Sequence, residues 1–242
     1  MSNQTAFLPY TLGAIDVNNR IVMAPMTRTR AVNNLANELI AEYYSQRASA
    51  GLIISEGISP SPNGLGYARM PGIFSREQVQ TWKPVTAAVH TAGGKIVAQL
   101  MHAGRIGSKL NLPAGATLVA PSAVQAPGQI YTDVQGLQPH DIPTALDESR
   151  IMQTKQEFVK AALHAIEAGF DGVELHAANG YLLEQFLSPH TNRRTDQYGG
   201  NIENRIRFVV EVTEAVAHAI GKERVGIRIS PFGVFNDMPH YD

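Results

Sequence analysis

The sequence of 242 residues contains no cysteine and no surplus of charge of either sign. Without cysteine, disulfide frameworks, zinc ribbons, iron–sulfur clusters and thiol nucleophiles are all excluded. Lys and Arg number 20 against 21 Asp and Glu, so the composition gives no electrostatic reason to expect nucleic acid or an anionic membrane as a partner. The eight histidines include no pair at the spacing of a metal-binding helix, so no metal site is predicted. A small molecule is the expected ligand.

Long apolar runs are also missing. The amino-terminal stretch lacks the basic start and apolar core of a signal peptide, and no apolar run approaches the roughly 18 residues of a membrane span. We therefore expect a soluble, cytoplasmic protein. The hydrophobic fraction of 44% is ample for a buried core and argues against disorder. No linker or repeat interrupts the chain, so residues 1–242 are predicted to form one domain.

Short β-rich runs alternate with amphipathic stretches, which is typical of a parallel sheet covered by helices. The predicted strands are Arg20–Ala24, Leu52–Ser55, Lys95–Leu100, Gly172–His176 and Arg224–Ile229. Helices are predicted at about Asn37–Ala50 (ending at Gly51), behind a capping box of Ser75 and Gln78, from about Ser149 to Ala168 (ending at Gly169), and after Gly200. The last three are expected to bury the stripes Val79, Trp82, Val85 and Val89; Phe158, Ala161, Ala162, Ala165 and Ile166; and Ile202, Ile206, Val209, Val210, Thr213, Val216, Ala217 and Ile220.

Residues 101–148 break this alternation. They have no helical periodicity and contain five prolines, Pro113, Pro121, Pro127, Pro139 and Pro143. We predict an irregular insertion directly after the third strand, and a long insertion in a compact domain usually serves as a lid or a binding loop.

A polar side chain occurs at or near the carboxyl end of each predicted strand, where a parallel strand buried on both faces should be apolar. These residues are Thr27, Glu56, Gln99, His176 and Arg228. In a TIM barrel such positions surround one active site. Arg228 shares its strand face with the small residues Gly226 and Ser230, which leaves room for a planar ligand.

The length decides between two α/β folds. Five strands occupy about 230 residues, so a closed TIM (β/α)8 barrel would need roughly 370. An open, doubly wound sheet fits the length, but its first turn would carry a glycine-rich phosphate loop, and here that turn reads Pro25-Met-Thr-Arg-Thr-Arg30. We therefore predict an incomplete TIM barrel that covers about strands 1–5.

Five motifs follow one another along the chain: Arg20-Ile-Val-Met-Ala-Pro-Met-Thr-Arg28, Gly51-Leu-Ile-Ile-Ser-Glu-Gly57, Gln99-Leu-Met-His-Ala-Gly-Arg105, His176-Ala-Ala-Asn-Gly-Tyr-Leu-Leu-Glu-Gln-Phe-Leu-Ser-Pro189 and Asn192-Arg-Arg-Thr-Asp-Gln-Tyr-Gly-Gly200. Together they resemble the signatures of the old yellow enzyme family, which comprises FMN-dependent ene-reductases of the N-ethylmaleimide reductase type on a TIM barrel. The resemblance runs from about Phe7 to Phe232. It implies FMN as cofactor, NADPH or NADH as reductant, and α,β-unsaturated carbonyls, maleimides, quinones or nitro compounds as acceptors.

The resemblance also implies roles for individual residues. Seven residues correspond to FMN-binding positions: Pro25, Met26, Thr27, Gly57, Gln99, His176 and Arg228. His176 and Asn179 resemble the pair that binds the substrate carbonyl oxygen, and Tyr181 resembles the proton donor. Tyr67 and Met101 correspond to lining residues of the substrate pocket, and relatives often have tryptophan in place of Met101.

Other interpretations stay open at this point. Taken alone, Tyr181 could be a packed aromatic residue, and Arg228 could form an ion pair with Glu174 or Glu56. The loops after strands 7 and 8, which build the phosphate site of many TIM barrels, are not in these 242 residues. The alternative function is therefore a non-catalytic fragment, or a subunit that needs a complementing carboxy-terminal chain.

Overall fold

The computed structural model describes residues 4–240 and has a five-stranded parallel sheet at its centre. The strands lie in the order β11-β10-β5-β4-β3, which follows the sequence. Their bounds are Val22–Met23 (β3), Leu52–Ile58 (β4), Ile96–Leu100 (β5), Gly172–Ala177 (β10) and Val225–Ile229 (β11). All five predicted strands are present, and β3 and β11 form two open edges. The described residues therefore build the incomplete barrel that the sequence predicts.

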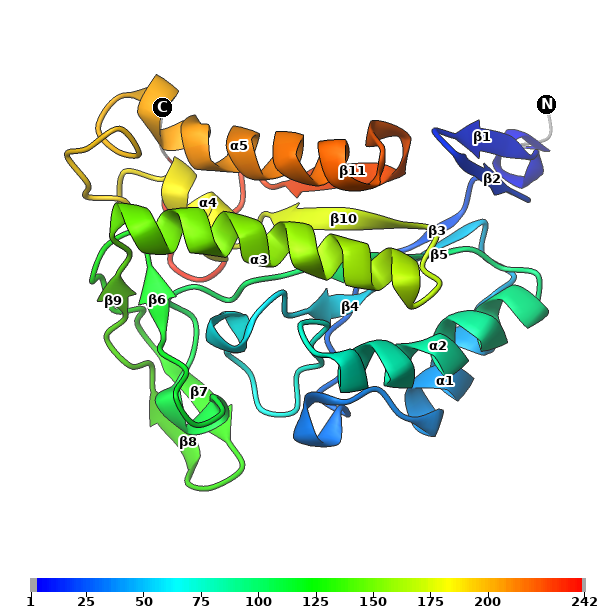
Figure 1. The fold of residues 1–242 in the computed structure, drawn as a ribbon, viewed down its shortest axis with the longest axis horizontal. Coiled ribbons are helices and arrows are strands. Elements are labelled where there is room, and N and C mark those ends of the chain that lie inside the picture. The colour runs from blue at the N-terminus through cyan, green and yellow to red at the C-terminus, as the bar shows by residue number, and fades with distance from the viewer. Residues whose placement is uncertain (1–3, 241–242) are drawn as a thin grey trace.

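Helices cover the outer face of this sheet (Figure 1). They are α1 (Glu38–Ser45), α2 (Arg76–Thr91), α3 (Glu148–Glu167), α4 (Leu182–Leu187) and α5 (Ile202–Ile220). Short 3-10 helices span Gln4–Phe7, Val32–Asn34, Pro62–Gly64, Lys109–Asn111 and Lys222–Arg224. Helix α1 packs against α2, and α3 packs against α5. Over residues 4–240, none of these helices is long and apolar enough to cross a membrane.

The ends of the helices largely follow the sequence signals. The capping box of α2 is confirmed. The main-chain N–H of Gln78 donates to Ser75 Oγ at 3.1 Å, and the main-chain N–H of Ser75 donates to Gln78 Oε1 at 3.0 Å. Gly169 ends α3 with a φ of +92°. The predicted end at Gly51 is wrong, since α1 stops at Ser45. Gly51 has a different role: a Cβ there would lie 1.8 Å from the Asn19 carbonyl oxygen.

The predicted apolar stripe of α5 is only partly right. The buried residues are Arg205, Phe208, Val209, Val212 and Val216. Ile202, Ile206 and Val210, which the stripe also included, are exposed. Helix α5 carries apolar residues around more than half of its circumference. Periodicity alone therefore does not distinguish the apolar side that packs on α3, α4 and β11 from the adjacent apolar side, which is exposed. The predicted face of α2 is buried in full, and α3 buries its predicted face except for the half-buried Ile166.

The insertion at residues 101–148 has more regular structure than expected. It contains an antiparallel hairpin, β7 (Gln129–Thr132) with β8 (Gly136–Pro139), and a short parallel pair, β6 (Val119–Ala120) with β9 (Thr144–Ala145). Figure 1 shows these strands as a separate projection below α3 and α4.

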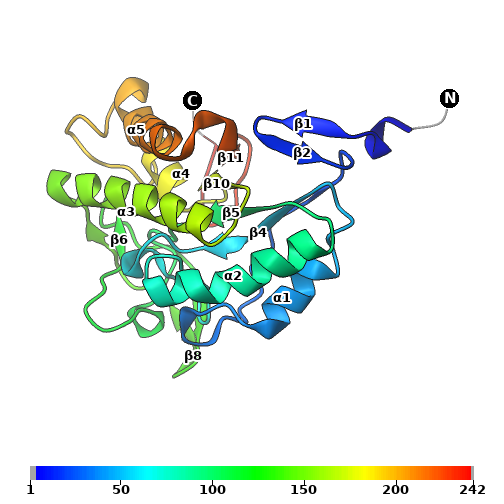
Figure 2. The ribbon, with the colours of Figure 1, turned by 45° about the vertical axis from the view of Figure 1, so that its right-hand side comes forward.

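A second hairpin, β1 (Tyr10–Leu12) with β2 (Ile15–Val17), covers the amino-terminal end of the sheet (Figure 2). Ile15 and Val17 pack with Leu52 and Val97, which lie at the beginnings of β4 and β5. The amino-terminal ends of the strands are therefore partly covered, and their carboxyl ends carry the polar residues that the sequence singled out.

Candidate functional site

The registers of the sheet align several predicted site residues. Gly57 is paired with Gln99 across β4 and β5, and Gln99 is paired with Glu174 across β5 and β10. Two residues further along β10, His176 is paired with Arg228 of β11. The Gln99 side chain donates from Nε2 to Glu174 Oε1 at 2.8 Å. The predicted Gln99, His176 and Arg228 thus lie on neighbouring strands.

Arg228 does not form the ion pair that was the structural alternative. Glu174 is bonded to Gln99, and Glu56 to Arg28 and Tyr44, whereas the half-buried Arg228 guanidinium has no hydrogen-bond partner among residues 4–240. Burial raises the pKa of Glu174, and the hydrogen bond from Gln99 and the positive charge of Arg228 oppose this rise. The charge of Arg228 is therefore felt by Glu174 without a direct ion pair. A guanidinium held in a sheet without a carboxylate partner is suited to an electron-rich ligand edge.

Two tyrosines meet beside this row. Tyr181 is only 8% exposed, and its hydroxyl lies 2.9 Å from the hydroxyl of Tyr67. Burial raises the pKa of both phenols. The two hydroxyls share this hydrogen bond, and either of them can be the donor. Both hold their protons at neutral pH.

His176 and Asn179 flank Tyr181 with uncommitted polar groups. The His176 ring lies 5.1 Å from that of Tyr181. Burial, reinforced by the charge of Arg228, lowers the pKa of His176 to about 4, so the imidazole is neutral at neutral pH. Its Nδ1 is buried without a partner among the described residues. The Asn179 side-chain amide likewise makes no hydrogen bond within residues 4–240, whereas its main-chain N–H donates to Ser230 Oγ at 2.9 Å.

The predicted lining residues belong to the same cluster. Met101 is 2% exposed and packs with Tyr181 and the half-buried Tyr67. A Cβ on Gly57 would lie 2.8 Å from Met101 Sδ, so the glycine allows Met101 to occupy this place.

The first motif lies further out. Pro25, Met26 and Thr27 follow β3 at the edge of the sheet. Pro25 is half-buried, Met26 is 50% exposed, and Thr27 is exposed with a hydroxyl that makes no hydrogen bond in the described part of the chain. The structure thus brings Gly57, Gln99, Met101, His176 and Arg228 near the tyrosine pair, and leaves these three at the open edge.

Glu56 does not join the site, contrary to the sequence expectation. A register shift between Ile54 and Gly57 interrupts the alternation of β4. The Glu56 carboxylate is 1% exposed and lies on the helix side, where it accepts from the Arg28 amide at 3.3 Å and from the Tyr44 hydroxyl at 3.5 Å. Burial raises its pKa from 4.5 to about 7 despite the opposing effects of Arg28 and Tyr44.

This shift predicts a pH-dependent stability. The folded-state pKa of Glu56 lies above the unfolded value. The protonated carboxyl therefore makes its full contribution to the free energy of unfolding below about pH 4.5, and this contribution is lost as the pH rises through about 7. The loss should be on the order of 3 kcal/mol. Glu56→Gln should remove it, as measured by urea unfolding at pH 5 and pH 8. Glu214→Gln, at an exposed position on α5, is the matched control, and equal pH dependence in wild type and Glu56→Gln would contradict the assignment.

Sequence reasoning missed four residues that support the site. Arg105, Glu184, Ser230 and Asn236 form hydrogen bonds around residues 179–181 or to the chain that follows β11. Arg105 ends one of the quoted motifs, and a charged residue within an otherwise apolar stretch was the available signal. Glu184 lies four residues after Gly180, within the motif that begins at His176, whereas Ser230 and Asn236 come from distant segments that no spacing rule connects.

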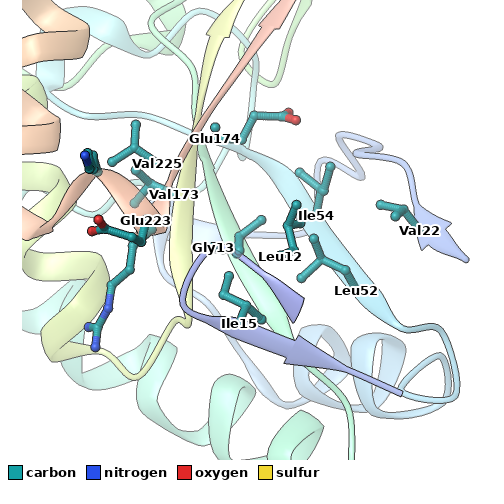
Figure 3. Close-up of a pocket in the computed structure, with 14 residues that line it drawn as sticks. Leu12, Gly13, Ile15, Val22, Leu52, Ile54, Val173, Glu174, Glu223 and Val225 are labelled. Carbon is teal, nitrogen blue, oxygen red and sulfur yellow. The ribbon is translucent and has the colours of Figure 1, made fainter. Parts of the chain in front are cut away.

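A cavity of about 340 Å³ lies toward the amino-terminal ends of the strands, and Glu174, the hydrogen-bond partner of Gln99, is part of its lining (Figure 3). Its lining is mostly apolar and includes Leu12, Ile15, Leu52 and Val173. It contains neither His176 nor Tyr181. We therefore assign the candidate site by its chemistry at the carboxyl ends of the strands, as is general for parallel barrels.

Comparisons with known proteins identify the family to which the chain belongs. Residues 5–241 match the model of the NADH:flavin oxidoreductase / NADH oxidase family. The chain is 44% identical over 252 residues to putative 12-oxophytodienoate reductase 5 of Oryza sativa subsp. japonica, covering 100% of this chain and 65% of that protein. It is 44% identical over 239 residues to a probable flavin mononucleotide-dependent alkene reductase of Leishmania infantum, covering 97% and 66%.

Solved structures are similarly close. The old yellow enzyme homologue of Zymomonas mobilis superposes with a TM-score of 0.94 at 49% identity, covering 98% of this chain and 66% of that one. Morphinone reductase superposes with a TM-score of 0.94 at 46% identity, covering 100% and 66%. The chain thus spans less than two thirds of the length of these relatives.

Proposed function

The chain belongs to the NADH:flavin oxidoreductase / NADH oxidase family, the old yellow enzyme family that its motifs predicted, and from this premise we propose that it serves an FMN-dependent ene-reductase. The proposed acceptors are α,β-unsaturated carbonyls, maleimides, quinones or nitro compounds, and the proposed reductant is NADPH or NADH. We propose the cytoplasm as its location.

The residues present fit FMN. Among residues 4–240, the Arg228 guanidinium and the buried Nδ1 of His176 have no hydrogen-bond partner. The Gln99 amide nitrogen donates to Glu174, which leaves the Gln99 side-chain oxygen available. Gln99 and Arg228 would hold the pyrimidine edge of the ring, with Pro25, Met26, Thr27, Gly57 and His176 as further contacts. When bound, FMN supplies the hydride of the reaction.

The substrate end is proposed to be built from neutral donors. His176 and Asn179 would bind the acceptor's carbonyl oxygen, which polarises the conjugated double bond and stabilises negative charge on that oxygen. Because its pKa is lowered, His176 acts as a neutral N–H donor. Tyr181 would deliver a proton to the α carbon, and the contact with the Tyr67 hydroxyl holds its own hydroxyl in place. Tyr67 and Met101 would shape the pocket.

The observation that carries this proposal is the 2.9 Å contact between the hydroxyls of the buried Tyr181 and the half-buried Tyr67, beside a neutral histidine. The direct test mixes purified protein with FMN and follows a shifted, protein-retained flavin spectrum, then measures NAD(P)H oxidation with a cyclic enone. Retained flavin without enone-dependent turnover would contradict the reductase assignment.

A second candidate is favoured by the two open edges of the sheet. Strands β3 and β11 each have one unpaired side, and Val22, Ile227 and Ile229 on them are 43–62% exposed. On this proposal the chain is a non-catalytic subunit until a complementing chain adds the remaining βα units. Turnover that appears only after addition of a polypeptide carrying those units would support it.

Replacing Arg228 by Leu should lower the flavin midpoint potential, because reduced flavin carries negative charge that the guanidinium stabilises. Loss of one charge-assisted hydrogen bond of about 1.5–3 kcal/mol corresponds to roughly 30–60 mV for two electrons. Redox titration of the FMN-loaded complex of this chain with a complementing chain measures the shift in midpoint potential. Arg224→Leu, at the other end of the strand, is the control, and an unchanged midpoint in Arg228→Leu would assign Arg228 a purely structural role.

A further inference from the structure

The chain after β11 returns to the candidate site (Figure 1, red). Its residues 230–238, here called the return segment, contact the Asn179–Gly180 turn at both the main-chain N–H and the main-chain carbonyl of Asn179. Ser230 Oγ accepts from the Asn179 N–H at 2.9 Å, and Asn236 Nδ2 donates to the Asn179 carbonyl at 2.8 Å. Packing is equally tight, because a Cβ on Gly180 would lie 2.7 Å from Asn236 Cβ. The return segment therefore fixes the main chain of Asn179.

The return segment needs an external support. Asn236 and Asp237 both have a left-handed backbone, with φ of 59° and 58°. Two consecutive non-glycine residues in this region are unfavourable unless surrounding contacts hold them. Asn179, with φ of 57°, is in the same region.

Arg105 supplies that support. Its side chain is 1% exposed, and its Nη2 donates to the carbonyls of Asn236 and Asp237 at 3.0 Å each and to Asp237 Oδ2 at 3.3 Å. Its Nη1 donates to the Gln125 carbonyl at 3.3 Å. The Arg105 main chain is itself fixed, since its N–H donates to Oε1 of the fully buried Gln185 on α4 at 3.0 Å.

The other contact to Asp237 is weaker. His190 lies 3.1 Å from the same carboxylate oxygen, but both side chains are more than a third exposed, and exposed pairs contribute little. The buried Arg105 guanidinium is thus a stronger anchor of residues 236 and 237 than His190.

We propose that Arg105 is a positioning residue, whose guanidinium holds the return segment against the Asn179–Gly180 turn and thereby fixes the orientation of Asn179. The consequence for catalysis rests on the proposed function, in which Asn179 binds the substrate oxygen. The positioning itself does not depend on that function.

Hydrogen exchange of the full chain, read by mass spectrometry, tests the positioning without cofactor or substrate. In Arg105→Met, the amides of residues 232–238 and of Asn179 and Gly180 should exchange at least about 10-fold faster, while those of α2 and α3 keep their wild-type rates. The exchange rates in Arg105→Lys should lie between those of wild type and Arg105→Met, because an ammonium keeps the charge but lacks the several N–H donors of the planar guanidinium. Arg150→Met, at an exposed position on α3, is the matched control and should change nothing.

Two results would overturn the proposal: wild-type exchange at Asn179 and Gly180 despite faster exchange in the return segment, or equal acceleration throughout the chain. If Arg105→Met does not fold, Arg105→Lys decides alone, and wild-type exchange at the turn in that variant rejects the proposal.

A double-mutant cycle in the FMN-loaded complex tests the catalytic consequence. Arg105→Met should slow enone reduction about 10-fold in the wild-type background and less than about 2-fold in an Asn179→Ala background, because its effect passes through Asn179. Equal slowing in both backgrounds would reject a route through Asn179. If wild type itself shows no enone reduction, the proposed function fails, whereas the exchange result still decides the positioning.

Discussion

Replacing Tyr181 by Phe should slow enone-driven reoxidation of the FMN-loaded complex by about 10²–10⁴-fold and leave its reduction by NAD(P)H almost unchanged. Saturation of an enone requires a proton at the α carbon, whereas hydride transfer from the nicotinamide requires no acid. Tyr181 is buried, protonated at neutral pH and hydrogen-bonded to the Tyr67 hydroxyl. Quinones, which need no protonation at carbon, should be affected much less.

Stopped-flow measurement of both half-reactions, with a complementing chain if FMN loading needs one, separates the possible outcomes. Tyr67→Phe is the matched control, since it removes the other hydroxyl of the same 2.9 Å contact and leaves Tyr181 in place. It should slow the enone step far less. Equal slowing of both half-reactions in Tyr181→Phe would indicate a packing defect. Stronger slowing in Tyr67→Phe would assign the acid to Tyr67.

Local patterns in the sequence predicted most of the fold. The strands and the capping box at Ser75 depend on residues close in the sequence, and their positions agree with the structure to within a few residues. The set Gln99, His176 and Arg228 was also predictable, because polar residues in buried strands are exceptional and parallel strands align their carboxyl ends.

Glu56 shows where such reasoning stops. Its position in the sequence predicts a side chain in the site, and a local register shift turns it toward Tyr44 instead. A bulge of this kind depends on pairing between strands, which no periodicity within one strand reports. The exposed Ile202 and Ile206 of α5 have a related cause, since only the neighbouring helices decide which apolar side is buried.

Long-range contacts were beyond the sequence for a simpler reason. The Tyr67 and Tyr181 hydroxyls meet across 114 residues, and Arg105 reaches Asn236 across 131. The family resemblance predicted that Tyr67 and Tyr181 share one pocket, but not that they are hydrogen-bond partners. The contacts of Arg105 with Asn236 and Asp237 could be identified only from the tertiary structure.

A polypeptide of residues 1–242 should bind FMN weakly, with a dissociation constant above about 1 μM. The groups proposed to hold the ring, among them Gln99, His176 and Arg228, are all present. The five-stranded sheet has no strands 7 and 8 among the described residues, and the loops after those strands commonly hold a phosphate in TIM barrels. Each missing charge-assisted hydrogen bond is worth about 1.5–3 kcal/mol, so together they lower the affinity by several orders of magnitude.

Riboflavin provides the matched control for this prediction, because it has the same ring and lacks the phosphate. In isothermal titration calorimetry, FMN and riboflavin should bind the polypeptide with affinities within about 3-fold of each other. Addition of a chain that supplies the remaining βα units should strengthen FMN binding by at least 100-fold and riboflavin binding far less. Submicromolar binding of FMN by residues 1–242 alone, with a clear preference over riboflavin, would contradict the prediction, since it requires a phosphate site within this part of the barrel.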